Sequence, residues 1–333
     1  MTARIIEIGK VDTWNRSPPK PILETSLLRR TRTEDPEMSH EIHSERVHAN
    51  GLDFNVNVCG EGDRLALCLH GFPELGFSWR HQLPLLASLG YRAWAPDLRG
   101  YGRTDRPQGL DHYAIERLVE DVSALIDASG ARETTLLAHD WGAVIAWQFA
   151  AEQARNLERL VILNGPPPGG GQNRPSIFSR QFWRMLYVFF FQIPWLPERV
   201  LAARDYRVIE DAFRGSISAQ PERFTDDVVR VYKEAAAVPG ALTAMLNYYR
   251  ALVRGGGLKR MLARGFPVIE TPTLLVWGEQ DPILPPAILN DANLWVTDLT
   301  VRFIPNAGHW VQQEAPETVN SILEAWLTGQ AVP

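Results

Sequence analysis

The chain of 333 residues has little cysteine, no strong excess of charge of either sign and no long apolar run. Its two cysteines, Cys59 and Cys68, cannot build a disulfide framework. We expect them to be small core residues of a protein kept in a reducing compartment. With 34 Lys and Arg against 39 Asp and Glu, the chain lacks the basic face that a general nucleic-acid binder needs. No nucleic-acid partner is therefore expected.

The apolar segments are too short to anchor or target the chain. The most apolar window, residues 182–196, is interrupted by Arg184, Gln192 and Pro194. It falls short of the roughly 20 residues that a membrane-spanning helix needs. The apolar stretch at the N-terminus is too short for the core of a secretory signal. We therefore expect no membrane span and a cytoplasmic location.

Hydrophobic patterning divides the chain into an arm, a core in two pieces and an insertion. Residues 1–39 are polar and proline-bearing, and are predicted to form an extended or poorly ordered arm. In 40–164 and 266–333, short apolar runs typical of strands alternate with amphipathic helical patterns. The intervening residues 165–265 open with a Pro/Gly-rich stretch and show helical patterns only. The sequence thus predicts an α/β fold, with a mostly parallel sheet, helices on both faces and a helical cap inserted after the sixth strand.

Individual elements can be located from the same patterns. The predicted strands are 53–59, 65–69, 91–95, 134–137, 160–163, 273–277 and 301–304, and the predicted helices of the core are 115–126, 143–151 and 317–327. The continuous apolar run at 65–69 is typical of a strand buried on both faces. The segment 40–43 has two histidines, but it lacks the i, i+4 spacing of a zinc-binding helix. We therefore interpret it as an exposed strand, and no metal site is expected.

A strand-to-helix turn at 136–143 carries the first candidate catalytic residue. Ala138 and Gly142 are the small residues that a very tight turn requires, and Asp140 lies between them. This pattern is typical of a nucleophile elbow, with aspartate where serine is usual. The N-terminus of the following helix would favour the ionised carboxylate. A simple helix-capping role would suit the same position, so both interpretations are open.

Two further segments supply a candidate base and its partner. His309 follows the last predicted strand, where a base can reach over the sheet edge to Asp140. Asp281 follows the strand at 273–277 and is the candidate to orient His309, with Glu279 as the fallback.

The turn after the strand at 65–69 adds candidate hydrogen-bond donors. The glycine-proline turn leaves the backbone N–H of Phe72 unpaired. Together with the backbone N–H of Trp141, it would form a two-donor oxyanion hole.

These segments together resemble the epoxide hydrolases of the α/β-hydrolase fold. The motifs that match are His70-Gly71-Phe72-Pro73, Pro96-Asp97-Leu98-Arg99-Gly100-Tyr101-Gly102, His139-Asp140-Trp141-Gly142, Trp277-Gly278-Glu279-Gln280-Asp281 and Gly308-His309-Trp310. They occur in the family's order across roughly residues 45–328. The resemblance implies that Asp140 is the nucleophile, His309 the base and Asp281 its partner, and that no cofactor is needed.

The resemblance also implies two proton donors in the cap. Residues 184–192 and 246–250 resemble the family's two cap motifs, which implies Tyr187 and Tyr249 as donors to the epoxide oxygen. A phenol is protonated at neutral pH and can donate to a leaving alkoxide. Either tyrosine alone would also fit a packed aromatic with its hydroxyl at the surface.

The expected activity is the hydrolysis of an apolar epoxide by water to a vicinal diol, through a covalent alkyl ester on Asp140. A haloalkane or haloacid dehalogenase would use the same Asp-His-Asp machinery, and the indole of Trp141 could donate to a halide. Phe72 does not favour a dehalogenase, because many dehalogenases carry asparagine after the His-Gly pair. A third alternative is a non-catalytic hydrolase-like binding protein, but none of the triad candidates is missing.

The substrate pocket is expected to include His70, Pro73, Phe190 and Trp310. The chain also carries a run of large aromatic side chains in and near the insertion, namely Phe182, Trp183, Phe189, Phe190, Phe191 and Trp195. We expect most of this run to pack the cap onto the core. Whether the protein is a monomer or a homodimer is left open.

Overall fold

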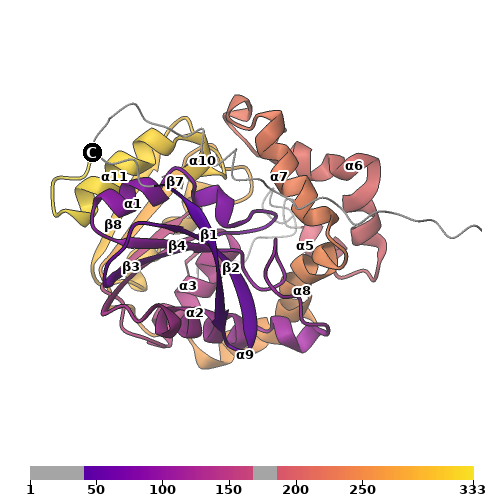
Figure 1. Cartoon of the computed structure of the whole chain (residues 1–333), viewed down its shortest axis with the longest axis horizontal. Helices are drawn as coiled ribbons and strands as arrows, with labels where there is room; N and C mark the ends of the chain where they lie inside the picture. Colours follow the sequence, from indigo (N-terminus) through magenta and orange to yellow (C-terminus); the bar gives the residue numbers. More distant parts are fainter. Residues whose placement is uncertain (1–40, 168–185) are drawn as a thin grey trace, which may run out of the picture.

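A computed structural model describes residues 41–167 and 186–333, and an eight-stranded sheet runs through it (Figure 1). The strand order is β1-β2-β4-β3-β5-β6-β7-β8. The β1–β2 and β2–β4 pairs are antiparallel, and the remaining pairs are parallel. The predicted α/β fold with a mostly parallel sheet is confirmed. The arm at 1–39, Phe182 and Trp183 lie outside the described residues.

The elements follow the alternation read from the sequence. The strands are β1 (His43–Ala49), β2 (Leu52–Cys59), β3 (Arg64–Leu69), β4 (Arg92–Pro96), β5 (Glu133–His139), β6 (Arg159–Leu163), β7 (Thr273–Gly278) and β8 (Leu299–Ile304). The helices outside the insertion are α1 (Leu83–Ser88), α2 (Ile115–Ser129), α3 (Trp141–Ala151), α10 (Val311–Glu314) and α11 (Pro316–Leu327). The insertion between β6 and β7 contains α5 (Leu186–Phe190), α6 (Leu196–Arg214), α7 (Asp226–Ala237), α8 (Ala241–Val253) and α9 (Gly257–Arg264).

The short helices α1 and α10 were not predicted, and two predicted elements have different bounds. The first strand is β1, which begins at His43 and extends to Ala49 instead of covering 40–43. It is an edge strand with mostly exposed side chains, so it lacks the hydrophobic alternation that reveals a half-buried strand. Helix α3 begins at Trp141, before the predicted start at 143, because the tight turn at Asp140 leads directly into it.

The sheet separates two apolar clusters, and β3 contributes to both. Leu65, Leu67 and Leu69 belong to the cluster that includes side chains of α2 and α3. Ala66 and Cys68 belong to the cluster that includes α1 and α11. All five side chains are fully buried, as predicted for a strand covered on both faces. Complete burial stabilises the fold by about 1.5–3 kcal/mol for each leucine.

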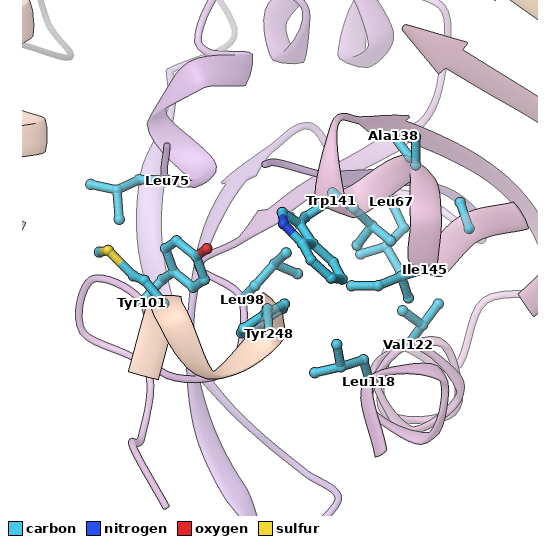
Figure 2. Close-up of a cluster of buried hydrophobic side chains, with 14 of the residues drawn as sticks. Leu67, Leu75, Leu98, Tyr101, Leu118, Val122, Ala138, Trp141, Ile145 and Tyr248 are labelled. Carbon is cyan, nitrogen blue, oxygen red and sulfur yellow. The ribbon is translucent and has the colours of Figure 1, made fainter. Parts of the chain in front are cut away.

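The insertion rests on the first of these clusters. Figure 2 shows the ring of Trp141, at the start of α3, among the side chains of Leu98, Ile145 and Tyr248. The rings of Trp141 and Tyr248, which belongs to α8, have centroids 5.5 Å apart. The turn at Asp140 is thus packed against both the core and the insertion. Within the described ranges, no helix is long and apolar enough to cross a membrane.

The turn between β5 and α3 is crowded on every side. Asp140 has φ 48° and ψ −116°, a backbone conformation that costs a non-glycine residue about 1–3 kcal/mol. A Cβ atom on Gly142 would lie 2.4 Å from the carbonyl oxygen of Leu69. A Cβ atom on Gly71 would lie 2.3 Å from the Cβ of Asp140. Both positions therefore need glycine for close backbone approach.

We predict that Gly142→Ala lowers the free energy of unfolding by at least about 3 kcal/mol, because backbone cannot move aside as a side chain can. Gly90→Ala is the matched control, since Gly90 has φ +82° and open space around its Cα. It should cost only the backbone strain of about 1–2 kcal/mol. Urea unfolding of both variants measures the difference, and equal losses would contradict the crowding argument.

Candidate active site

The carboxylate of Asp140 is hydrogen-bonded to the turn after β3 and not to the helix that follows it. Its side chain makes no capping hydrogen bond to α3, so the helix-cap interpretation is wrong. Instead, Oδ1 accepts a hydrogen bond of 2.8 Å from the backbone N–H of Phe72. The side chain is 18% exposed, so a molecule in the adjoining cavity can reach it. Burial opposes ionisation, but His309 and the Phe72 N–H outweigh it and lower the pKa of Asp140.

His309 lies between two carboxylates. Its Nε2 is 3.6 Å from Oδ2 of Asp140, and its Nδ1 is 2.7 Å from Oδ2 of Asp281. Burial disfavours the imidazolium, but the two negative charges prevail and raise the pKa of His309 well above its ordinary value. The two carboxylates thus favour the protonated form of the imidazole that lies between them.

Asp281 is fixed by four hydrogen-bond donors. Oδ1 accepts from the backbone N–H groups of Ile283 and Leu284, at 2.7 and 2.9 Å. Oδ2 accepts from Asn164 Nδ2 at 2.7 Å as well as from His309. Burial raises the pKa of Asp281, but His309 and these donors lower it overall. Asp281 is therefore the carboxylate that is hydrogen-bonded to His309, whereas Glu279, the fallback candidate, is exposed.

Tyr187 and Tyr249 lie on the insertion side of the same cavity as Asp140. Their ring centroids are 5.9 Å apart. Burial raises the pKa of both phenols, and the negative charge of Asp140 raises it further. Both side chains therefore keep their protons and can donate hydrogen bonds.

The cavity that these residues share has a volume of about 430 Å³ and mostly apolar walls. Pro73, Phe190 and Trp310 line it, and Asp140 and His309 are among its polar groups. Phe191, Leu201 and Ile209 are among the other side chains of the wall.

His70 does not line the cavity, contrary to the prediction. It is fully buried, and its Nε2 accepts a hydrogen bond from the backbone N–H of Leu98 at 2.9 Å. Nδ1 therefore carries the proton and donates to the carbonyl of Gly71 at 2.8 Å. Burial holds the pKa of His70 below its ordinary value, so the ring is neutral and braces the turn that presents Phe72.

The aromatic run of the insertion divides into two groups. Phe190 and Phe191 line the cavity. Phe189 and Trp195 are 57% and 62% exposed. When a short helix is apolar all round, its sequence does not show which of its sides the rest of the protein will cover.

The prediction missed a buried ion pair behind Asp140. His139 Nδ1 is 2.7 Å from Oε2 of Glu74, and His139 Nε2 is 2.8 Å from the backbone carbonyl oxygen of His309. Glu74 also accepts from Gln312 and Gln313, and its pKa is lowered despite burial. Both ring nitrogens of His139 therefore face a hydrogen-bond acceptor, which fixes the orientation of the ring.

In the parts of the chain that the structure describes, no group of three or more His, Cys, Asp or Glu side chains is arranged to hold a metal ion.

We predict that the stability advantage of the wild type over His309→Gln depends on pH. Because folding raises the pKa of His309 above 6.5, its stabilisation is complete below about pH 6.5. It then falls by about 1.4 kcal/mol per pH unit until the folded pKa is passed. Folding lowers the pKa of Asp140 and Asp281 below 3.8, so their share is lost only as pH falls below that value. Urea unfolding from pH 5 to 9 tests this, and a difference that stays constant across the range would contradict it.

Comparison with known proteins is consistent with this geometry. Residues 66–322 match the model of the Alpha/beta hydrolase family. The AB hydrolase superfamily protein YfhM of Bacillus subtilis is 35% identical over 286 residues, covering 85% of this chain and 97% of that protein. Epoxide hydrolase 3 of Xenopus tropicalis is 36% identical over 288 residues, covering 85% of this chain and 76% of that protein.

Solved structures agree with the sequence comparison. The crystal structure of a Bacillus megaterium epoxide hydrolase in complex with an inhibitor has a TM-score of 0.74 and 28% identity, over 85% of this chain and 100% of that chain. Epoxide Hydrolase A from Mycobacterium thermoresistibile has a TM-score of 0.73 and 29% identity, over 88% and 100%. The chain therefore belongs to the α/β hydrolase family and, within it, to the epoxide hydrolases.

Proposed function

We propose that the protein hydrolyses an apolar epoxide to a vicinal diol through a covalent ester on Asp140, with residues 165–265 serving as the cap. One observation carries the proposal: an ionised carboxylate and two protonated phenols line the same apolar cavity. A carboxylate attacks saturated carbon, and a phenol donates to the oxygen that leaves. An epoxide presents both atoms at adjacent positions.

The first step opens the ring. Tyr187 and Tyr249 donate hydrogen bonds to the epoxide oxygen, while Oδ2 of Asp140 attacks a ring carbon. The carbon–oxygen bond of the ring breaks, and the new alkoxide takes a proton from one phenol. The phenolate regains a proton from the His309 imidazolium through water. The other oxygen of Asp140, Oδ1, is already held by the Phe72 N–H and becomes the carbonyl oxygen of the ester.

Esterification changes the charge beside His309 and so prepares the second step. Asp140 loses its negative charge, which is one of the causes that raise the pKa of His309. The imidazole can then give up its proton and act as a base. Asp281 keeps the ring in place and the remaining proton on Nδ1.

The second step hydrolyses the ester. His309 takes a proton from water, and the hydroxide adds to the carbonyl carbon of Asp140. The developing charge on Oδ1 is stabilised by the N–H of Phe72 and by that of Trp141, whose N–H at the first turn of α3 has no acceptor within the helix. The bond from this carbon to the alkyl oxygen breaks, the diol oxygen takes a proton from His309, and the acid proton of Asp140 restores the imidazolium.

Dehalogenation has less support from the same geometry. The indole expected to donate to a halide is that of Trp141, but this side chain is buried and its ring packs against Tyr248 and Tyr249, with centroids 5.5 and 4.9 Å away. It is not among the residues that line the cavity. The non-catalytic alternative has no missing member of the triad to support it.

We predict that the protein converts styrene oxide to its diol and releases no halide from a haloalkane, and that Asp140→Asn has no measurable turnover. In His309→Gln, attack still occurs but hydrolysis is blocked. Intact-protein mass spectrometry should therefore show an added mass equal to that of styrene oxide. Halide release without diol formation would favour the dehalogenase alternative instead.

We predict that Tyr249→Phe lowers the rate of ester formation about 10²-fold, since it removes a proton donor to the leaving oxygen. Tyr206→Phe is the matched control, because Tyr206 lies on α6 and is not among the lining residues of this cavity. Single-turnover mass spectrometry follows ester formation directly. Equal rates in the two variants would show that Tyr249 is only a packed aromatic.

A further inference from the structure

Glu314 is a buried carboxylate that the steps above do not use. It ends the short helix α10, and its residue is 2% exposed. Its Oε2 accepts from the backbone N–H groups of Gly308 and Ala219, at 2.7 and 2.9 Å. Its Oε1 accepts from the backbone N–H of Trp310 at 3.1 Å. A side chain buried at this cost, with all its bonds made to backbone, fixes the position of the chain segments that it joins.

One of these segments is the loop that carries the base. Gly308 and Trp310 flank His309 on both sides, so the Glu314 carboxylate holds the N–H groups of both neighbours. The carbonyl oxygen of His309 is held separately by His139. The position of the imidazole is therefore set by backbone anchors on each side of it.

The other segment belongs to the insertion and forms part of the cavity wall. Ala219 follows closely after Ser216 and Ile217, which both line the cavity. The contact between the segments is tight, since a Cβ atom on Gly308 would lie 2.7 Å from the carbonyl oxygen of Ile217 and 2.9 Å from the nitrogen of Ala219. The backbone N–H of His309 also points to the carbonyl oxygen of Ile217, at 3.5 Å. A substrate in contact with Ile217 thus touches a segment that is hydrogen-bonded to Glu314. The loop that carries His309 is bonded to the same carboxylate.

We propose that Glu314 is a positioning residue that couples the cap wall at 216–219 to the base His309. A substrate bound in the cavity then influences the position of His309 during ester hydrolysis. The inference rests on the proposed function, because it assigns Glu314 to the step in which His309 acts. Asp140 is anchored elsewhere, through Phe72 and the turn at Gly142, so its attack on the epoxide does not depend on this carboxylate.

The test separates the two steps by rapid-quench mass spectrometry with styrene oxide. Glu314→Gln keeps the size of the side chain but places an NH₂ group against backbone N–H donors. We expect ester hydrolysis to slow by about 10²-fold, because a small misplacement of a catalytic group has effects of that size. Ester formation should change by less than about 3-fold. The variant therefore accumulates ester, and its kcat and KM fall together.

Glu317→Gln is the matched control. Glu317 also joins the core to the insertion, through a pair of 3.0 Å with Arg223, but its side chain is 71% exposed and is not bonded to the His309 loop. Both rates should stay within about 2-fold of the wild type, as expected for an exposed ion pair. The proposal would be overturned if Glu314→Gln hydrolysed the ester at the wild-type rate, or if it slowed ester formation and ester hydrolysis equally.

A second variant keeps the proposal testable if Glu314→Gln does not fold. Ala219→Pro removes the insertion-side N–H and leaves the carboxylate and its bonds to Gly308 and Trp310 in place. We expect selective slowing of hydrolysis, and unchanged hydrolysis in this folded variant would overturn the coupling. Failure of the wild type to form any ester would instead contradict the proposed function.

Discussion

The close approach of backbone around Asp140 is the constraint on which the rest of the site depends. Asp140 takes an unfavourable backbone conformation because β5 must turn at once into α3, with Gly142 against the end of β3 and Gly71 against Asp140 itself. The same crowding brings the Phe72 N–H to within 2.8 Å of the carboxylate. The strained turn thus holds the carboxylate against a backbone donor, and in the proposed mechanism this donor also stabilises the oxyanion.

Charge balance organises the buried groups around this turn. His309 is placed between Asp140 and Asp281, and His139 is paired with Glu74 directly behind it. Each buried imidazole is paired with a carboxylate, which offsets the large cost of burying that carboxylate alone. In the proposed mechanism, esterification of Asp140 removes one negative charge, so His309 becomes a base only after the first bond has formed.

The sequence identified the residues whose roles follow from local motifs, whereas pairings across the fold were not visible. Asp140 was recognisable because Ala138 and Gly142 flank it, and His309 and Asp281 because each follows a late strand. Glu74 and His139 are 65 positions apart, and Asn164 and Asp281 are 117 apart, so only the folded sheet brings each pair together. The burial of His70 and the exposure of Trp195 likewise depend on neighbours that no local pattern specifies.

The central claim is that Asp140 bonds covalently to the substrate, and the fate of one oxygen atom tests it most directly. A single turnover of excess enzyme with styrene oxide in ¹⁸O-labelled water, followed by peptide mass spectrometry, locates the label. If water attacks the ester carbonyl, the label enters the carboxylate of Asp140 and the first diol carries none. Label in the first diol, with none in Asp140, would show direct attack of water on the epoxide and contradict the covalent mechanism.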